Sequence, residues 1–88
     1  MIWQTAEELN LELAKRLKAI RKRKHITQET LSVKSNVSYG SIKRFETTGN
    51  ISLISLTRIC IALGCESELK NLFTSIAYSS IDEVINEK

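Results

Sequence analysis

The spacing of apolar residues predicts a chain of short helices. The first stripe repeats at intervals of three and four residues, which puts its members on one helical face: Leu9, Leu13, Leu17 and Ile20. Thr5 followed by Glu8 has the spacing of a capping box, in which the hydroxyl and the carboxylate each accept a backbone N–H of the other residue. We therefore expect a first helix from about Thr5 to Lys24 or His25.

Two shorter helices are predicted next, separated by a tight turn. Thr27 is a candidate N-cap for a segment that ends near Lys34. Asn36 tolerates the left-handed conformation that ends a helix sharply, and Ser38 is placed to cap a third helix running to Glu46. The inward-facing positions of these two helices are expected to be Leu31, Ser32, Ile42 and Phe45.

The second half of the chain predicts two further helices. The composition of Thr47 to Asn50 is that of a loop, and Ser52 is placed to cap a fourth helix that Gly64 ends. A fifth helix is expected from Glu66 to about Ile76, and a short sixth element could begin at Ser80. The inner face of the fourth helix is expected to be Leu53, Leu56, Ile59, Cys60 and Leu63.

These elements predict an all-α fold with five helices, in one domain over residues 1–76, followed by a short C-terminal extension over residues 77–88. A chain of 88 residues with 42% hydrophobic residues suits one compact domain. Because so short a chain buries only about two-thirds of its unfolded surface, its stability is expected to be marginal without a partner. The length therefore favours an oligomer.

Charge is distributed unevenly along the sequence. The net charge is only +3, but ten of the 13 basic residues lie between Lys15 and Arg44, where Glu29 is the single acid. From Glu66 onward acids outnumber bases, five to two. A dense cluster of lysine and arginine is the electrostatic pattern expected for a polyanion such as a nucleic acid, although a solvated helix face has the same composition.

The sequence argues against several other classes of protein. Neither histidine nor cysteine is paired with a convincing base, and there is no glycine-rich phosphate loop, so an enzyme is rejected. Cys60 and Cys65 match no zinc or redox spacing and are interpreted as reduced core residues, and His25 lacks companions for a metal site. We expect no cofactor, no metal, no membrane contact and a cytoplasmic location.

The residues of the second and third helices resemble a known family. Ile26 to Leu31, then Asn36 to Ser38, Ser41 with Ile42, and Arg44 to Glu46 are similar to the lambda-repressor-like, Xre/Cro-type helix-turn-helix family. This resemblance covers about Leu13 to Phe73, and it implies a five-helix DNA-binding domain whose third helix enters the major groove. His25 departs from it, because many members of that family have a glycine there.

The resemblance implies roles for individual residues. Gln28 would contact a phosphate and brace the recognition helix, and Arg21 and Glu46 would form a structural ion pair between the first and third helices. The residues that it places at DNA are Thr27, Gln28, Ser38, Tyr39, Gly40, Ser41, Lys43, Arg44, Thr47, Thr48 and Asn50.

Base recognition is expected mainly from two of these residues. Arg44 could donate two hydrogen bonds to a guanine, and Tyr39 could pack on a thymine methyl group or reach a phosphate. The stretch from Thr47 to Asn50 is expected to meet the DNA backbone through main-chain amides and small polar groups. Gly40 allows the backbone to approach DNA closely, or is incidental.

The C-terminal half suggests a second interface. Its apolar residues would contact a second copy or another partner, or alternatively would fold back onto the core of their own chain: Leu69, Leu72, Phe73, Ile76, Tyr78, Ile81, Val84 and Ile85. A helix-turn-helix monomer covers few base pairs, so a homodimer on a pseudo-palindromic double-stranded DNA operator is expected.

Several stretches also resemble one group within this family. They are similar to HipB-type antitoxins, which pair with HipA-type kinase toxins, and run from Phe45 to Gly49, from Ile51 to Leu53, from Ala62 to Cys65, over Leu72 and Phe73, and from Tyr78 to Ile81. This resemblance implies a repressor that is also the antitoxin of its operon. The alternative is a phage or chromosomal Cro-like regulator with no toxin partner.

Overall fold

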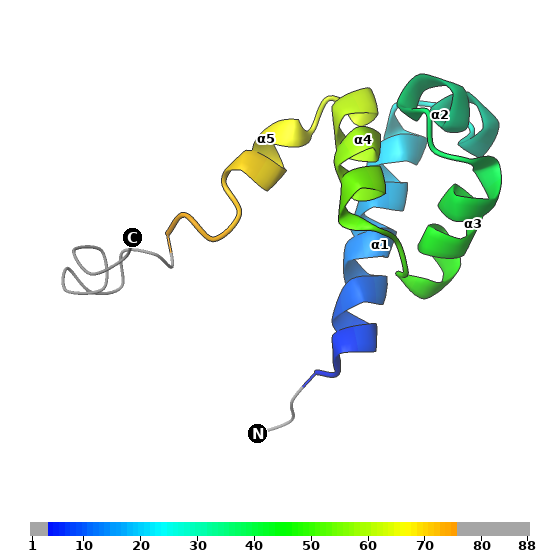
Figure 1. The fold of residues 1–88 in the computed structure, drawn as a ribbon. Coiled ribbons are helices and arrows are strands. Elements are labelled where there is room, and N and C mark those ends of the chain that lie inside the picture. Colours follow the sequence, from blue (N-terminus) through cyan, green and yellow to red (C-terminus); the bar gives the residue numbers. More distant parts are fainter. Residues whose placement is uncertain (1–3, 76–88) are drawn as a thin grey trace.

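The structure is a computed structural model that describes residues 4–75, and within this range every regular element is a helix (Figure 1). The predicted all-α, five-helix fold is therefore confirmed. The possible element near Ser80 and the extension 77–88 lie outside the described residues. The helices are α1 (Ala6–Arg23), α2 (Gln28–Ser35), α3 (Tyr39–Thr48), α4 (Leu53–Leu63) and α5 (Glu66–Lys70).

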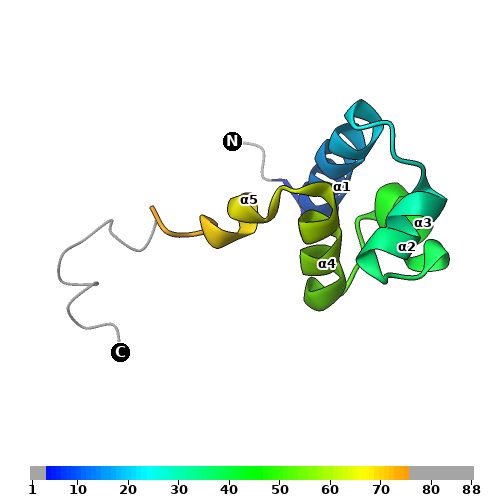
Figure 2. The same cartoon turned by 90° about the horizontal axis from the view of Figure 1, so that it is seen from above.

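The first four helices form a bundle around one small core. α1 packs against α3, α2 packs against both α3 and α4, and α5 contacts α4. In Figures 1 and 2, α5 and residues 71–75 lead away from the bundle. The side chains at the centre are almost fully buried: Ala14, Leu31, Val37, Ile42, Phe45, Ile59 and Leu63. None of the helices within residues 4–75 is long and apolar enough to cross a membrane.

Hydroxyl side chains begin the first four helices, as predicted. Thr5 Oγ1 accepts the N–H of Glu8 at 3.1 Å, and the Glu8 carboxylate accepts the N–H of Thr5 at 2.9 Å, which completes the capping box. These bonds to Thr5, led by its backbone N–H, lower the pKa of Glu8. Thr27, Ser38 and Ser52 each accept the N–H three residues further on.

Residues with a left-handed backbone conformation end α2, α3 and α4. Asn36, Gly49 and Gly64 have φ values of 58°, 82° and 74° and stand directly after α2, α3 and α4. His25 also has a φ of 58°, so this position adopts the conformation that a glycine would adopt with least strain. At the end of α4, the Cys65 N–H donates to Cys60 O at 2.9 Å. The thiol of Cys60 is buried, and burial raises its pKa to about 12.

The predicted inner faces of α1 and α4 are partly wrong. Leu9 and Leu13 are each 45% exposed and Leu53 is 72% exposed, whereas Ala14 is completely buried. The two buried residues of α1 are Ala14 and Arg21. The spacing of apolar residues predicts both helices correctly, but the bundle buries only part of the apolar face of each helix. Ser35 rather than Ser32 is the second buried residue of α2.

Two helix ends also differ from the prediction. α3 continues to Thr48, so Thr47 and Thr48 lie in the helix and not in a loop. Their hydroxyls donate to backbone carbonyls of the same helix, for example from Thr48 Oγ1 to Arg44 O at 2.6 Å. α5 ends at Lys70 instead of near Ile76, because the chain enters turns that include Phe73 at a φ of 69°.

A buried ion pair joins α1 to α3. Arg21 Nε lies 2.7 Å from Glu46 Oε2 and Arg21 Nη2 lies 2.9 Å from Glu46 Oε1, so the guanidinium and the carboxylate meet in a two-pronged contact. A third guanidinium nitrogen, Nη1, donates to Ile26 O at 2.8 Å. Both side chains are less than one-tenth exposed.

The surroundings of Glu46 favour its charged form. Burial by itself raises the pKa of this carboxyl, but hydrogen bonds from Arg21 and Gln28, together with the positive charges of Arg21 and Lys18, outweigh burial and lower the pKa overall. A carboxyl whose pKa is lowered by folding stabilises the fold above its unfolded pKa, and this contribution disappears as the pH falls through the folded pKa.

We predict that Glu46→Gln lowers the free energy of unfolding by about 3 kcal/mol at pH 7, because Arg21 is left buried with no charged partner. The difference from the unsubstituted protein should be complete above pH 4.5, the ordinary value for this carboxyl, and should shrink at lower pH, where Glu46 itself becomes neutral. Urea unfolding between pH 3 and pH 7 measures both. Glu12→Gln, which removes the surface pair with Arg16, is the control and should have a much smaller effect. A pH-independent difference would contradict the role given to the charge.

We also predict that substitution by alanine destabilises the protein to different extents at Gly49 and Gly64, the two glycines with positive φ. A Cβ on Gly49 would lie 2.6 Å from Asn10 C and 2.7 Å from Leu11 N, which are backbone atoms of α1 that cannot move aside. At Gly64 the nearest atom is the flexible Lys24 Nζ at 3.6 Å. Gly64→Ala should therefore cost about 1 kcal/mol for its backbone conformation alone, and Gly49→Ala about 3 kcal/mol in thermal unfolding. Equal costs would mean that Gly49 is needed only for its φ.

Candidate nucleic-acid interface

α3 has one side fixed in the core and one side open to solvent. Ile42, Phe45 and Glu46 are buried, and the first two belong to the hydrophobic core. The exposed side carries Tyr39, Gly40, Ser41, Lys43 and Arg44. Lys43 Nζ lies 4.8 Å from the centre of the Tyr39 ring, a cation–π contact between two successive turns of this surface. The helix thus presents two cations and one aromatic ring without disturbing its packing.

Gln28 connects α2 to this helix. Its side-chain Nε2 donates to Glu46 Oε1 at 2.8 Å, so Gln28 shares the carboxylate with Arg21. An amide nitrogen carries two hydrogens, so one remains for a further acceptor at the start of α2. Glu46 is therefore bound by side chains of α1 and α2 at once, and this fixes the rotation of α3 relative to both helices.

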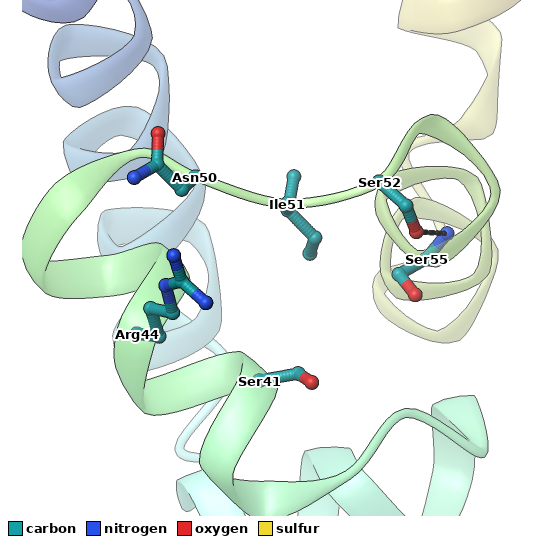
Figure 3. Close-up of a pocket in the computed structure, with 6 residues that line it drawn as sticks. All are labelled: Ser41, Arg44, Asn50, Ile51, Ser52 and Ser55. Carbon is teal, nitrogen blue, oxygen red and sulfur yellow. Dashed lines mark hydrogen bonds between the residues drawn. The ribbon is translucent and has the colours of Figure 1, made fainter.

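A hollow of about 330 Å³ lies beside Arg44, between α3 and the first turn of α4. In Figure 3 the Arg44 side chain rises from α3 toward the connection to α4, and Ser41 points toward α4. The other residues that line the hollow are Asn50, Ile51, Ser52 and Ser55. An arginine opposite the start of a helix is a favourable environment for an anion, because unpaired N–H groups and the helix dipole add to its charge.

The backbone amides after α3 are already used within the chain. Gly49 N–H donates to Phe45 O at 2.7 Å, and Asn50 N–H donates to Thr48 Oγ1 at 3.1 Å. These two main-chain groups can therefore meet a phosphate only by giving up a bond that ends α3. The Asn50 side chain lines the hollow and makes no hydrogen bond to the described residues, so it is the donor left at this position.

The eleven residues assigned to DNA contact occupy the start of α2, α3 with its N-cap, and the connection to α4. All of them are exposed except Gln28, which is half-buried. Two polar residues of the same surface were not assigned from the sequence, namely Ser52 and Ser55, which line the hollow. The sequence predicted Ser52 only as an N-cap. Its position shortly after a basic helix was the signal that could have placed it on the same surface. The contacts with DNA themselves stay predictions.

Gly40 has no structural requirement within the chain. A Cβ at this position would meet nothing within 4 Å, and its φ is not positive. Nothing in the described part of the chain therefore needs a glycine there. The same open space would let another molecule approach the backbone of the first turn of α3.

The bundle geometry agrees with a family-level comparison. Residues 17–69, more than half of the chain, match the helix-turn-helix family model, and this range contains α2, α3, α4, the last seven residues of α1 and most of α5. No curated protein and no solved structure matches the chain. The matched range includes the ion pair that orients α3 and the exposed surface of that helix. The chain therefore belongs to the lambda-repressor-like, Xre-type helix-turn-helix family of DNA-binding transcription regulators.

Proposed function

We propose that this protein is a transcriptional repressor that binds a pseudo-palindromic DNA operator as a homodimer. The observation that carries this proposal is the two-sided character of α3, which is fixed by Ile42, Phe45 and Glu46 while its cations and its aromatic ring face outward. A helix held in this way can enter the major groove without reorganising, so little of the binding energy is spent on ordering the helix.

Base recognition is assigned to the outward residues of α3. Arg44 donates two hydrogen bonds to O6 and N7 of a guanine, which is the commonest specific contact of an arginine in the major groove. Tyr39 packs against a thymine methyl group or reaches a phosphate, and the Lys43 ammonium over its ring restricts its orientation. Ser38 and Ser41 already bond to each other, so they contribute short polar contacts close to the backbone.

Backbone contacts are assigned to the two ends of the motif. Thr27 lies at the start of α2, together with the side-chain amide hydrogen of Gln28 that Glu46 does not accept. Asn50 and Ser52 line the hollow beside Arg44. Such groups fix the register of the protein on DNA without reading its sequence. Thr47 and Thr48 act on this surface mainly as acceptors, because their hydroxyl hydrogens are bonded to helix carbonyls.

The homodimer is assigned to the apolar residues of the C-terminal half. Of these, Leu72 and Phe73 are more than half exposed in the single chain, and Leu69 is half-buried. The remaining members, Ile76, Tyr78, Ile81, Val84 and Ile85, lie outside the described residues. Two copies would place two recognition helices on half-sites about 34 Å apart, one turn of the DNA helix.

We further propose that the repressor is the antitoxin of a HipA-type toxin and represses their shared operon. This rests on the resemblance of residues 45–53, 62–65, 72–73 and 78–81 to HipB-type proteins. The second candidate is a Cro-like regulator with no toxin partner. The family match favours it in that it indicates a helix-turn-helix protein without indicating an antitoxin. The neighbouring reading frame distinguishes the two, because an antitoxin is encoded beside its toxin.

We predict that Arg44→Ala removes discrimination at one base pair of each half-site, worth about 1 to 3 kcal/mol, while leaving the unfolding temperature unchanged, because Arg44 is exposed. Competition binding with operators varied at single positions measures this. Lys70→Ala, which removes an exposed cation of α5, is the control and should leave base discrimination unchanged. If Arg44 instead bound a phosphate in the hollow, affinity would fall equally for all sequences. The slope of log K against log salt would then become shallower by about 0.9.

We predict that Gly40→Ala separates stability from binding. A methyl group at this position meets no atom of the chain, and alanine favours a helix over glycine, so the thermal stability should stay the same or rise by up to about 1 kcal/mol. Operator affinity should fall nonetheless, because the methyl group occupies the space through which DNA approaches the backbone. Fluorescence anisotropy with labelled operator measures the affinity. Unchanged affinity would show that this glycine is incidental.

A further inference from the structure

An apolar groove of about 470 Å³ runs between α1, α4 and α5, and it meets the hollow beside Arg44 only at Ile51, which lines both. Two of its lining residues are charged, Arg16 and Glu68, and six of the fifteen are leucines: Leu13, Leu17, Leu53, Leu56, Leu69 and Leu72. Three of them remain 45% to 72% exposed, namely Leu13, Leu53 and Leu72. Leucines gathered along one groove form a contiguous apolar surface, and such surfaces mark interaction sites more reliably than scattered exposed residues do.

We propose that this groove binds residues 76–88 of a second copy of the chain, and that the second copy receives the same segment from the first. The inference rests on the proposed homodimer and specifies how its two chains meet. In this arrangement, the segment covers the leucines of α1 and α4 that the bundle leaves exposed.

The path of the chain favours a second copy over the groove of the same chain. Leu72 lines the groove, and the described chain ends at Ser75, only three residues later. α5 and residues 71–75 lead away from α1 and α4 in both views (Figures 1 and 2). The last described residues of the chain are therefore directed away from α1 and α4. Thirteen residues span at most about 43 Å, which is enough to cross a neighbouring groove.

The chemistry of the segment also suits the groove. Its sequence contains four aliphatic residues that can replace water on the leucines, namely Ile76, Ile81, Val84 and Ile85. It carries three acids and one lysine, whereas residues 1–75 carry 12 bases and 7 acids. Opposite net charges draw the segment toward the body of the other copy and oppose stacking of two such segments on each other.

Reciprocal exchange also gives a closed assembly. When each chain fills the groove of the other, the contact is the same in both directions, so two copies satisfy it completely and no free groove remains to recruit a third. Phe73, which is 67% exposed in the single chain, lies on the arm that crosses between the two bodies and so becomes available for burial. A one-way contact would instead leave one groove open and one segment free, and further copies could then be added.

Two neighbouring residues of α4 provide a matched test by substitution. Leu53 lines the groove, whereas Ile54 is similarly exposed, at 59%, but does not line it. Glutamine at either position adds no charge near DNA. Leu53→Gln should weaken dimer association of the full chain by about tenfold or more in sedimentation equilibrium, and Ile54→Gln by less than about twofold. Equal effects of the two substitutions would overturn the proposal.

A mixed-isotope sample of the unsubstituted full chain tests the exchange directly. In a mixture of ¹³C,¹⁵N-labelled and unlabelled chains, isotope-filtered NOE spectra should show contacts between methyl groups of Ile81, Val84 or Ile85 in one chain and leucines of the groove in the other. Contacts found only within one chain would overturn the proposal. A dimer in which the groove leucines show no such contact would also overturn it and leave the homodimer intact. A monomer in sedimentation would overturn the homodimer together with the exchange.

Discussion

The contact between Arg21 and Glu46 is the constraint on which the orientation of the recognition helix depends. A single carboxylate receives Arg21 of α1 and Gln28 of α2, while Arg21 also binds the carbonyl of Ile26 in the α1–α2 connection. These bonds are 2.7 to 2.9 Å long, so the Arg21–Glu46 pair connects three helices and the connection between α1 and α2. A buried ion pair adds little net stability compared with apolar residues of the same volume, but it is costly to break on one side only. Its contribution here is direction, because leucines at these positions would allow α3 to rotate or slide, whereas the two-pronged contact allows one arrangement.

Around this point, the ends of the helices are determined by short local motifs, and these were predictable from the sequence. Thr5, Thr27, Ser38 and Ser52 were identified as caps because each supplies an oxygen to an N–H three residues away, and such a bond needs no distant neighbour. Asn36 and Gly64 were identified as helix ends because few other residues tolerate a positive φ. The helix-turn-helix motif itself was inferred from the resemblance of residues between Ile26 and Glu46 to a known family, and the family match agrees with it.

The sequence was less informative wherever tertiary neighbours decide the outcome. Leu9, Leu13 and Leu53 have the helical period of core residues, but periodicity does not say whether the protein's own bundle covers that face, and here it does not. The extra turn of α3 was missed because Thr47 and Thr48 have loop-like composition, while their hydroxyls in fact bond to carbonyls of the same helix. For the same reason the main-chain amides of Gly49 and Asn50, expected to meet DNA, turn out to be occupied. In each case the missing information was a partner group whose position only the folded chain reveals.

α1 contributes both to the ion pair with α3 and to the apolar groove, and in the proposed homodimer this would link the geometry of the dimer to DNA binding. α1 directs Arg21 toward α3 near its C-terminal end, and it directs Leu13 and Leu17 toward the apolar groove in its middle. A partner segment held in the groove is therefore positioned relative to α1, and through the ion pair it is positioned relative to the recognition helix. Because half-sites must lie about one DNA turn apart, a displacement of the segment along the groove would change the distance between the two recognition helices by a similar amount. In the proposed dimer, the position of the exposed leucines along α1 would therefore influence the spacing between the two copies of α3, in addition to adding contact area.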